Sequence, residues 1–473
     1  YNRADYICDG TNDQQEINQA IIDIIYSATT PVNKSKQGVV YLLDGTYNIS
    51  NKTSADGLTY IRPDTGGSVT ITTSGIVINP TAAAQSGISL IGAGRGTLLL
   101  RRSGSFTAII SANAADNILI SQLQIDGATG VAPDFGSVNA GIAFSDVTGS
   151  RIEKIWVRKI KSRGIYFSSS SDNNIISSNV ITDGYGGGIS INNSSNNLIC
   201  ANSIRDNPTY GGGIFISAGA GNLICNNSLN NNGSEGSIWL MGSNNNIISG
   251  NIVSNSATRG IYIYGGANNL ISNNIVQGTR GVGIGIWVTA GASNTVISNN
   301  LIRNNDGVGI SVESYSGKNC SIVGNMLIEN GGSTEGKNGI TFGGLSALIA
   351  SNYIYDSLPN PPASGTGYGI AITFADAPGK NYLAGNFIAG AGFSARIYEA
   401  LSDNKTTYYT GKEKLTLEQV TDNTGNIRSD NSFIKLVSGV GSTLDNGKSS
   451  GDILIIQGPD SGTVTPAVTN LKL

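Results

Sequence analysis

Two aspartates occupy equivalent positions in neighbouring copies of a sequence repeat. Stacking of the copies would bring their carboxylates close enough to act together. Asp183 and Asp206 each follow, by four positions, an Asn that recurs along the chain. If the copies stack as coils, the two backbones lie roughly 5 Å apart. That separation suits an acid and nucleophile pair or a Ca²⁺ site. Tyr185 and Tyr210 stand in the adjoining turns. We therefore take Asp183 and Asp206 as the candidate catalytic residues.

The same column also has an explanation that involves no chemistry. Turns favour Asp, Asn and Gly, because these residues tolerate unusual backbone conformations. Later copies carry mostly Asn or an acidic residue at this position, namely Asn231, Asn255, Asn304, Glu329 and Asp356. A turn is therefore the favoured interpretation of Asp183 and Asp206, with catalysis as the competing hypothesis.

A basic run, "RIEKIWVRKIKSR" at residues 151–163, is the second place where chemistry could occur. Arg158, Lys161 or Arg163 could act as the base of a β-elimination if Ca²⁺ acidified a uronate. Solvated outward positions on one strand also explain the run, and that interpretation is favoured. Apart from this Ca²⁺, we predict no cofactor and no resident metal.

The composition excludes whole classes of function. The 473 residues contain no histidine, which removes Ser-His-Asp and Cys-His nucleophiles and most zinc sites. A net charge of −3, with 13% charged residues, gives no basis for nucleic-acid binding. No apolar run approaches the ~20 residues that a membrane-spanning helix needs. The start at Tyr1 and several Asn-x-Ser/Thr sequons suit a processed, extracellular protein.

A repeat of roughly 24 residues organises the chain. In each copy an Asn lies three positions after one aliphatic residue and two before another. Short strands between Gly, Asn and Ser turns at one interval indicate a parallel β-helix, with coils about 4.8 Å apart. The Asn column fits a turn in the left-handed conformation, with its amides in register. The repeating residues are Asn179, Asn202, Asn227, Asn251, Asn274, Asn300, Asn325, Asn352 and Asn386.

A second strand in each copy alternates aliphatic residues, as in Ile261 and Ile263 or Ile284 and Ile286, so the residue between them points outward. Aromatic residues often fill this slot, and an exposed ladder of rings suits the apolar faces of sugars. Coverage by the C-terminal segment or a neighbouring subunit is an equally weighted alternative. Trp287 lies close to the column but is shifted along its strand. The predicted saccharide-binding residues are Tyr166, Tyr185, Tyr210, Phe215, Trp239, Tyr262 and Trp287.

Both ends of the chain differ from the repeats. Residues 10–28 predict an amphipathic helix that could cover the apolar end coil of a solenoid. After about residue 390 the phrase disappears, and two late strands predict a β cap or assembly element. The expected divisions are 1–110 for the N-terminal cap and first coils, 111–390 for the repeats and 391–473 for the C-terminal cap. The helical stripe consists of Ile17, Ala20, Ile21, Ile24 and Ile25.

The opening segments "ADYICDGTNDQQEINQAI", "GVVYLLDGTYNI" and "ISLIGAGRGTLLL" resemble those of the pectate-lyase-like superfamily. The later repeats are similar to those of the NosD and mannuronan-epimerase type. This resemblance, over about residues 1–390, implies a right-handed parallel β-helix. With the capping helix and the late strands, the expected fold is an all-β, right-handed parallel β-helix with an N-terminal capping helix and a C-terminal β cap. It implies no single activity, because the superfamily includes lyases, hydrolases, epimerases, adhesins and tailspikes. The Asp-Pro-His of mannuronan epimerases and the Gly-His-Gly of polygalacturonases are absent.

Three functions remain open. The favoured one is an extracellular, cell-surface or virion β-helix that recognises polysaccharide or cell-envelope glycan without efficient catalysis. The second is a polysaccharide lyase or glycoside hydrolase, including a tailspike depolymerase, acting through Asp183 and Asp206. The third is a structural sheath, filament or surface-layer subunit, whose partner is a further copy of the chain.

The four cysteines show no metal-binding spacing. Cys200 and Cys225 occupy equivalent positions in adjoining copies, about one coil spacing apart. Stacked parallel strands give a poor disulfide geometry, so two unbonded thiols are expected. Cys8 and Cys320 are too distant to pair with each other, and either could link to another chain.

Overall fold

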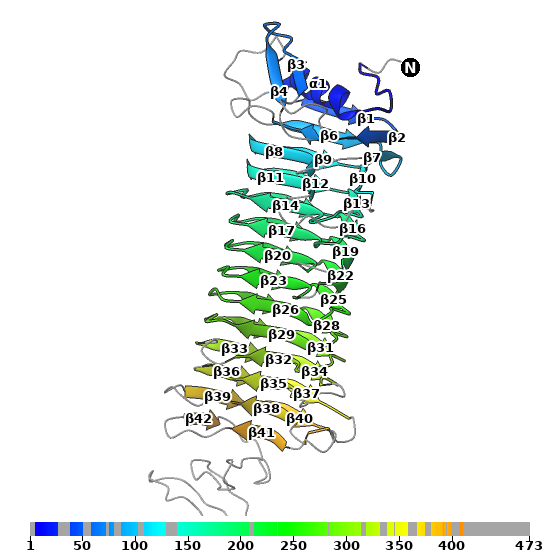
Figure 1. Cartoon of the computed structure of the whole chain (residues 1–473). Helices are drawn as coiled ribbons and strands as arrows, with labels where there is room; N and C mark the ends of the chain where they lie inside the picture. The colour runs from blue at the N-terminus through cyan, green and yellow to red at the C-terminus, as the bar shows by residue number, and fades with distance from the viewer. Residues whose placement is uncertain are drawn as a thin grey trace, which may run out of the picture.

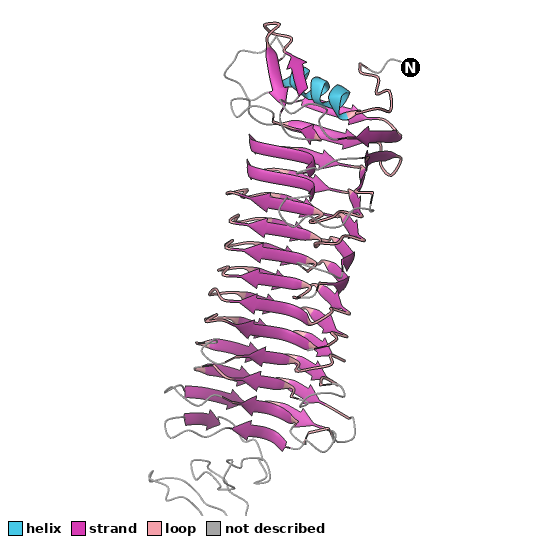
Figure 2. Cartoon of the chain, in the orientation of Figure 1, coloured by secondary structure: helices cyan, strands magenta, loops and turns pink. Residues whose placement is uncertain are grey.

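Three long parallel sheets run the length of the molecule and enclose a narrow interior (Figures 1 and 2). We call them sheets A, B and C, in the order in which the chain passes through them in each coil. This arrangement confirms the predicted all-β, right-handed parallel β-helix. The computed structural model describes residues 5–26, 38–50, 58–71, 75–79, 87–102, 108–128, 140–207, 212–233, 235–281, 283–313, 318–331, 338–344, 346–357, 367–373, 380–390, 392–393, 395–399 and 406–409.

Sheet A contains fourteen strands among the described residues. In spatial order they are β1 (Gly38–Leu42), β6 (Ile88–Gly92), β9 (Leu119–Ser121), β12 (Arg151–Glu153), β15 (Ile175–Ser177), β18 (Leu198–Cys200), β21 (Leu223–Cys225), β24 (Ile247–Ser249), β27 (Leu270–Ser272), β30 (Val296–Ser298), β33 (Cys320–Val323), β36 (Ala347–Ala350), β39 (Lys380–Ala384) and β42 (Thr406–Tyr409).

In each coil the chain passes from sheet A to sheet B. In most coils the corner between the two strands has two residues. Its strands are β2 (Gly45–Ile49), β7 (Thr97–Arg101), β10 (Gln124–Asp126), β13 (Trp156–Arg158), β16 (Val180–Thr182), β19 (Ser203–Asn207), β22 (Ser228–Asn232), β25 (Ile252–Ser254), β28 (Ile275–Gln277), β31 (Leu301–Arg303), β34 (Met326–Ile328), β37 (Tyr353–Tyr355) and β40 (Phe387–Ala389).

Sheet C closes each coil and carries the longest strands. Its strands are β5 (Ile76–Val77), β8 (Ala108–Asp116), β11 (Ala140–Thr148), β14 (Ile165–Ser168), β17 (Ile189–Asn192), β20 (Ile214–Ser217), β23 (Ile238–Met241), β26 (Arg259–Tyr264), β29 (Ile284–Thr289), β32 (Ile310–Val312), β35 (Ile340–Phe342), β38 (Tyr368–Ile372) and β41 (Ala395–Glu399).

A helix covers the first coil, as the sequence predicts. Helix α1 (Gln14–Ile25) buries Ile17 and Ile21 in the same core as the β-helix, while Ile22 packs into a small separate cluster. That cluster includes the antiparallel hairpin of β3 (Leu58–Ile61) and β4 (Ser68–Ile71), which lies beside α1 at this end of the molecule (Figures 1 and 2). The apolar end of the solenoid is therefore closed. The predicted C-terminal cap lies almost wholly outside the described residues, so it stays a prediction.

Aliphatic columns fill the interior. Ile248, Val253, Ile261 and Ile263 supply all three walls of one coil, and each is fully buried. The expected pairing of Ile284 and Ile286 with the strand before is wrong, because Ile286 and Val288 are the partners of Ile261 and Ile263. Ten positions separate residues 276 and 286, whereas eight separate 253 and 261, so the longer connection shifts strand β29 by two residues.

The repeating Asn lies inside the corner between sheets A and B, and Asn251 is typical. It is fully buried. Its Nδ2 donates to the Ile224 carbonyl at 2.9 Å and to Oδ1 of Asn274 at 3.0 Å. Its Oδ1 accepts the backbone N–H of Asn227 at 2.9 Å. The same amide-to-amide bonds connect every ladder residue from Asn179 to Asn386, which confirms the predicted register.

The expected left-handed conformation belongs to a different residue. None of the ladder Asn has a positive φ, whereas the residue before each often does, as in Ser178 (58°), Ala201 (57°) and Asn226 (53°). The left-handed residue turns the chain, and the Asn after it is then directed inward, where it satisfies backbone groups of neighbouring coils.

A glycine stands directly before the first inward-facing aliphatic residue of most sheet C coils, because the next coil passes too close for a side chain. A Cβ atom on Gly260 would lie 2.6 Å from the carbonyl oxygen of Gly285, and one on Gly285 would lie 2.6 Å from that of Gly309. The glycine that opens the repeated phrase is therefore required by close backbone approach.

Candidate functional site

Rings from four successive coils lie side by side on the outer face of sheet C. Phe215, Trp239, Tyr262 and Trp287 are Cα partners in β20, β23, β26 and β29. Successive ring centroids are 4.4, 6.0 and 5.0 Å apart. We call these four residues the aromatic strip. Trp287 is in direct register with Tyr262, so the expectation that it is shifted along its strand is wrong.

The rings of the strip cover one another. Tyr262 is nearly parallel to both Trp239 and Trp287, with interplanar angles of 13° and 20°, and it is only 7% exposed. The expectation of separately exposed ring faces is therefore wrong for Tyr262. A coil spacing of about 4.8 Å allows successive rings to stack. Tyr262, with a ring on each side, therefore presents little of its ring faces to solvent.

Polar groups border the strip at Tyr262. The guanidinium of Arg259 lies 4.7 Å from the Tyr262 ring centre and 4.1 Å from that of Trp287. It also donates to the half-exposed carboxylate of Glu235 at 3.0 Å. Tyr264 is 45% exposed and meets Tyr262 edge-on. Aromatic edges, a guanidinium, a carboxylate and a phenol therefore occupy one small area.

The strip contains one phenol hydroxyl and two indole N–H groups that are covered or nearly covered. Burial raises the pKa of the Tyr262 hydroxyl, and the positive charge of Arg259 opposes that rise. The indole N–H groups of Trp239 and Trp287 are covered and have no hydrogen-bond partner among the described residues. Buried indoles normally find an acceptor. Two donors of the strip are thus unused within this part of the chain.

The strip does not include the other three predicted binding residues. Tyr166 belongs to the same column, but Ser190 separates it from Phe215, and the guanidinium of Arg163 lies 5.0 Å from its ring centre. Tyr185 lies in the connection between β16 and β17 and is 38% exposed. Tyr210 lies outside the described residues. Tyr166 was predicted from its place in this column, and Tyr185 and Tyr210 from the turns just before the aromatic strand.

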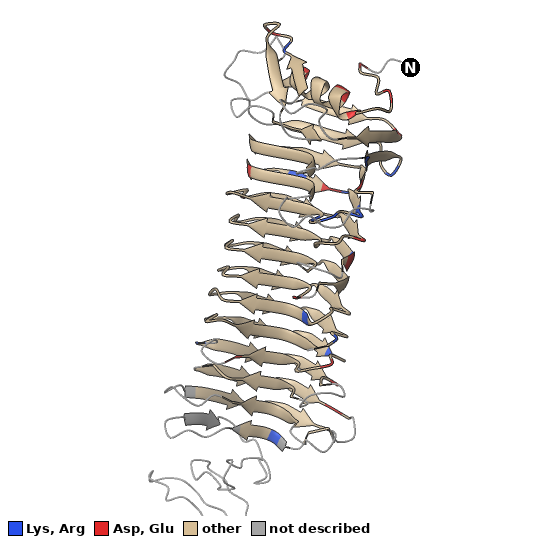
Figure 3. Cartoon of the chain, in the orientation of Figure 1, with Lys and Arg blue, Asp and Glu red and all other residues tan. Residues whose placement is uncertain are grey.

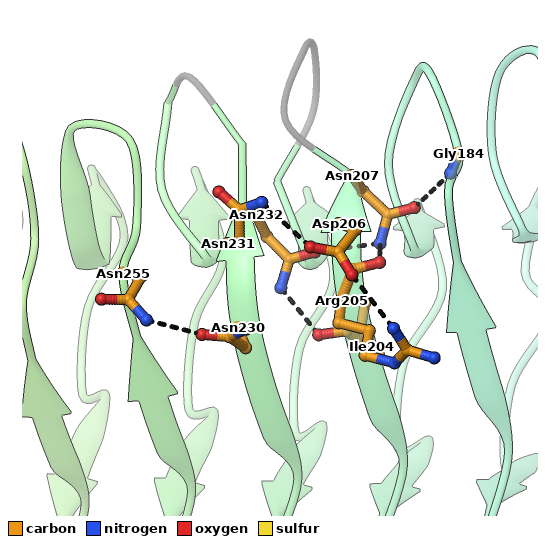
Figure 4. Close-up of polar contacts among 9 residues, drawn as sticks. All are labelled: Gly184, Ile204, Arg205, Asp206, Asn207, Asn230, Asn231, Asn232 and Asn255. Atoms are coloured by element: carbon orange, nitrogen blue, oxygen red, sulfur yellow. Dashed lines mark hydrogen bonds and ion pairs between the residues drawn. The ribbon is translucent and has the colours of Figure 1, made fainter.

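Asp183 directly follows strand β16 of sheet B, whereas Asp206 lies near the end of the neighbouring strand β19. Both are left-handed, with φ of 56° and 57°, and so are Asn231 and Asn255 in the following coils. Asp206 pairs with Arg205 at 3.1 Å and accepts from Nδ2 of Asn231 at 2.9 Å (Figure 4). No hydrogen bond joins the two aspartates, both of which the structure describes. The column therefore has the conformation that turns require.

The basic run contacts other side chains of the β-helix. Arg158 is ion-paired with the buried carboxylate of Asp126 at 2.8 Å, and Arg163 lies over Tyr166. Apart from the N-terminal cap, charged residues are sparse on the strands of sheet C and occur mainly on the side of sheet B (Figure 3). Arg158 and Arg163 thus have structural partners in the coil, in accord with the non-catalytic interpretation.

Sequence reasoning missed two features. The outer face of sheet A carries an uninterrupted aliphatic column, Ile175, Leu198, Leu223, Ile247, Leu270 and Val296. Its signal was present as the apolar residue at the start of each sheet A strand. At the N-terminal cap, ligand atoms of Cys8, Asp13 and Glu16 lie within 4.8 Å of one another. There Asp13 already accepts the backbone N–H groups of Gly10 and Asn48, which ties α1 to the first coil.

Comparison with known proteins agrees with this architecture. The family described as "Right handed beta helix region" matches residues 202–388, and that described as "Periplasmic copper-binding protein (NosD)" matches residues 68–237. No curated protein matches the chain in sequence. Both matches and the sheet topology show that the chain has the right-handed parallel β-helix fold.

Solved structures show the same fold at low identity. The Agl-KA catalytic domain is 14% identical with a TM-score of 0.54, covering 86% of this chain and 67% of its own. DFA-IIIase from Arthrobacter chlorophenolicus A6, in complex with GF2, is 13% identical with a TM-score of 0.50, covering 81% and 95%. The A-module of Azotobacter vinelandii mannuronan C-5 epimerase AlgE6 is 16% identical with a TM-score of 0.46, covering 86% and 98%. Among the described residues, no helix combines the length and apolarity that crossing a bilayer requires.

Proposed function

We propose that this chain recognises polysaccharide outside the cytoplasm, through the aromatic strip and its polar border, without efficient catalysis. The observation that carries the proposal is the stacking of Phe215, Trp239, Tyr262 and Trp287 in four successive coils. Rings on an outer face, away from the core, form an apolar surface that marks a partner site. The match of residues 68–237 to a family described as periplasmic supports a location outside the cytoplasm.

A glycan lying along the axis would match the spacing of the strip. One coil rises about 4.8 Å, which is of the order of one sugar residue, so successive sugars would meet successive ring edges. Arg259, Glu235 and Tyr264 supply donors and acceptors for sugar hydroxyls at the centre of this surface.

The lyase or hydrolase hypothesis gains no support from Asp183 and Asp206. Both have the turn conformation, and Asp206 is engaged by Arg205 and Asn231. Binding of Ca²⁺ at this pair, and the absence of any other cofactor, stay predictions.

One observation favours a second candidate function, lateral assembly as a sheath or filament subunit. The aliphatic column on sheet A includes partly exposed side chains, with Ile247 at 40% and Val296 at 36%. A parallel copy of the chain has the same repeat spacing and could align with this column. Particle imaging over a range of protein concentrations distinguishes an assembling subunit from a monomeric binding protein.

Affinity electrophoresis against a panel of neutral and uronate polysaccharides tests the recognition proposal. We expect at least one glycan to retard the protein, and Trp239→Ala to weaken that association at least tenfold, about 1.4 kcal/mol. Tyr353→Ala is the matched control, because Tyr353 stacks on Phe387 at 5.1 Å but lies on the outer face of sheet B. Unchanged retardation of a folded Trp239→Ala protein would contradict the proposal, as would a wild-type chain that no glycan retards.

A further inference from the structure

The cation at the aromatic strip is neutralised by its own neighbour. The guanidinium of Arg259 lies over the rings of Tyr262 and Trp287, 4.7 and 4.1 Å from their centres. One of its terminal nitrogens donates to the Glu235 carboxylate at 3.0 Å and to the Glu235 backbone carbonyl at 3.1 Å. The side chain of Arg259 is 16% exposed, whereas that of Glu235 is 47% exposed. A ligand therefore meets the carboxylate more readily than the guanidinium.

A second carboxylate lies at the other end of the sheet C strands. Arg259 is the first residue of β26, whereas Glu313 directly follows the last residue of β32. Glu313 is exposed, and its backbone N–H donates to the Val288 carbonyl at 3.0 Å. Burial has the largest effect on the pKa of the Tyr262 hydroxyl and raises it, Arg259 lowers it, and the carboxylates of Glu313 and Glu235 raise it further. Two negative charges and one positive charge therefore act at the centre of the strip.

We infer that the strip selects neutral polysaccharide and discriminates against glycans that carry carboxylate or sulfate groups. This inference rests on the proposed function, since it names the class of glycan that the strip would bind. Glu235 is the specificity-determining residue, because it pairs with the guanidinium that lies over two rings of the strip.

An anionic sugar would bind poorly on this surface for two reasons. Its charged group would leave water beside apolar rings, and such a transfer is unfavourable unless a partner of opposite charge compensates it. The carboxylates of Glu235 and Glu313 would also repel it, with an effect that grows as water is excluded. A neutral sugar avoids both effects. Its C–H groups contact the rings, and its hydroxyls can donate to Glu235 or bond with Tyr264, which is exposed.

Matched pairs of polysaccharides test the selectivity of the full chain. Lichenan, galactomannan and pullulan are the neutral probes, and the same polymers with their primary hydroxyl groups oxidised to carboxylates are the anionic probes. In affinity electrophoresis at low ionic strength, we expect at least one neutral probe to bind about tenfold more tightly than its oxidised form. Salt screens charge repulsion, so about 0.5 M NaCl should narrow this difference.

Glu235→Gln should remove the preference for the neutral form. The substitution deletes the carboxylate but keeps the backbone carbonyl that accepts from Arg259, so the guanidinium should stay over the rings. An oxidised probe can then pair with this guanidinium, and its affinity should rise about tenfold. Glu153→Gln is the matched control, because it also deletes a carboxylate that is paired with an arginine, Arg151, but on sheet A. The control should keep the preference of the parent.

Melting curves establish that each variant is folded, and Glu313→Gln provides a second test, with a smaller expected gain of about threefold for the oxidised probe. If the parent binds an oxidised probe as tightly as its neutral form, or more tightly, the inference is overturned while glycan recognition stands. A folded Glu235→Gln protein that keeps the parent's preference would overturn it as well. Absence of retardation by every probe would instead contradict the proposed function, and the selectivity with it.

Discussion

The corner between sheets A and B and the outer face of sheet C share one repeat but obey different constraints. At the corner, Asn occupies the ladder position in every coil from Asn179 to Asn386, because each side chain satisfies backbone groups of its neighbours. On the outer face, four successive coils carry rings without interruption, and Ser190 and Ser311 bound this run within a longer column. At the buried corner, hydrogen bonding to the backbone requires Asn in each of these coils. On the outer face of sheet C, the type of side chain is free to differ between coils. A local run of rings there is therefore the more informative sign of a binding surface.

Removing one ladder residue should have the largest effect. Asn251→Ala leaves the Asn227 N–H, the Ile224 carbonyl and the Asn274 Oδ1 without their bonds to this side chain. Each unsatisfied buried group costs about 1–3 kcal/mol, so the free energy of unfolding should fall by about 3–6 kcal/mol. Denaturant unfolding measures this loss. The control Asn255→Gly, at a left-handed turn residue, should change it by less than about 1 kcal/mol. Equal losses in the two variants would remove the distinction between corner and surface.

Truncating the centre of the strip should have an intermediate effect. Tyr262→Ala removes a ring that is stacked on both sides and almost covered, so we expect a loss of about 2–3 kcal/mol in the free energy of unfolding. Tyr264→Ala, at a ring that is 45% exposed, should cost less than about 1 kcal/mol. Chemical denaturation of both proteins compares them. A Tyr262→Ala loss as small as that of Tyr264→Ala would show that the stacked rings do not support one another.

The smallest effect is expected at the candidate carboxylate. Asp183→Asn keeps a residue type that tolerates the left-handed conformation, so stability should change by less than about 0.5 kcal/mol. Glycan retardation should be unchanged. Depolymerase assays on uronate and neutral polysaccharides provide the discriminating measurement, since a cleavage activity that this substitution abolishes would establish Asp183 as catalytic and refute the turn interpretation.

The sequence was informative wherever a residue type recurred at one interval. The aliphatic columns, the Asn amide register and the capping stripe of α1 all follow from periodicity, because the spacing alone decides which residues face inward. The conformation at the corner could not be read in this way. Asn is favoured both at left-handed positions and in amide ladders, and only the backbone shows that Ser178 takes the first role and Asn179 the second.

The candidate site was predicted less completely than the fold. Phe215, Trp239 and Tyr262 were assigned to one column correctly, but Trp287 was not, because the longer connection before β29 changes the count by two residues. The polar border was missed, since neither Arg259 nor Glu235 belongs to a repeating column. Arg259 begins strand β26, so their meeting depends on how the connection that carries Glu235, before β23, lies against the next coil.

By itself, the sequence determined that this chain coils with a fixed period, which residues form its interior and where a helix covers its first coil. These features depend on hydrophobic periodicity and on turn chemistry, and both are local. Only the tertiary structure decided that Tyr262 is covered by Trp239 and Trp287, and that Cys200 and Cys225 share a register position. Those contacts join residues some two dozen positions apart, so they depend on the length of every connection between them.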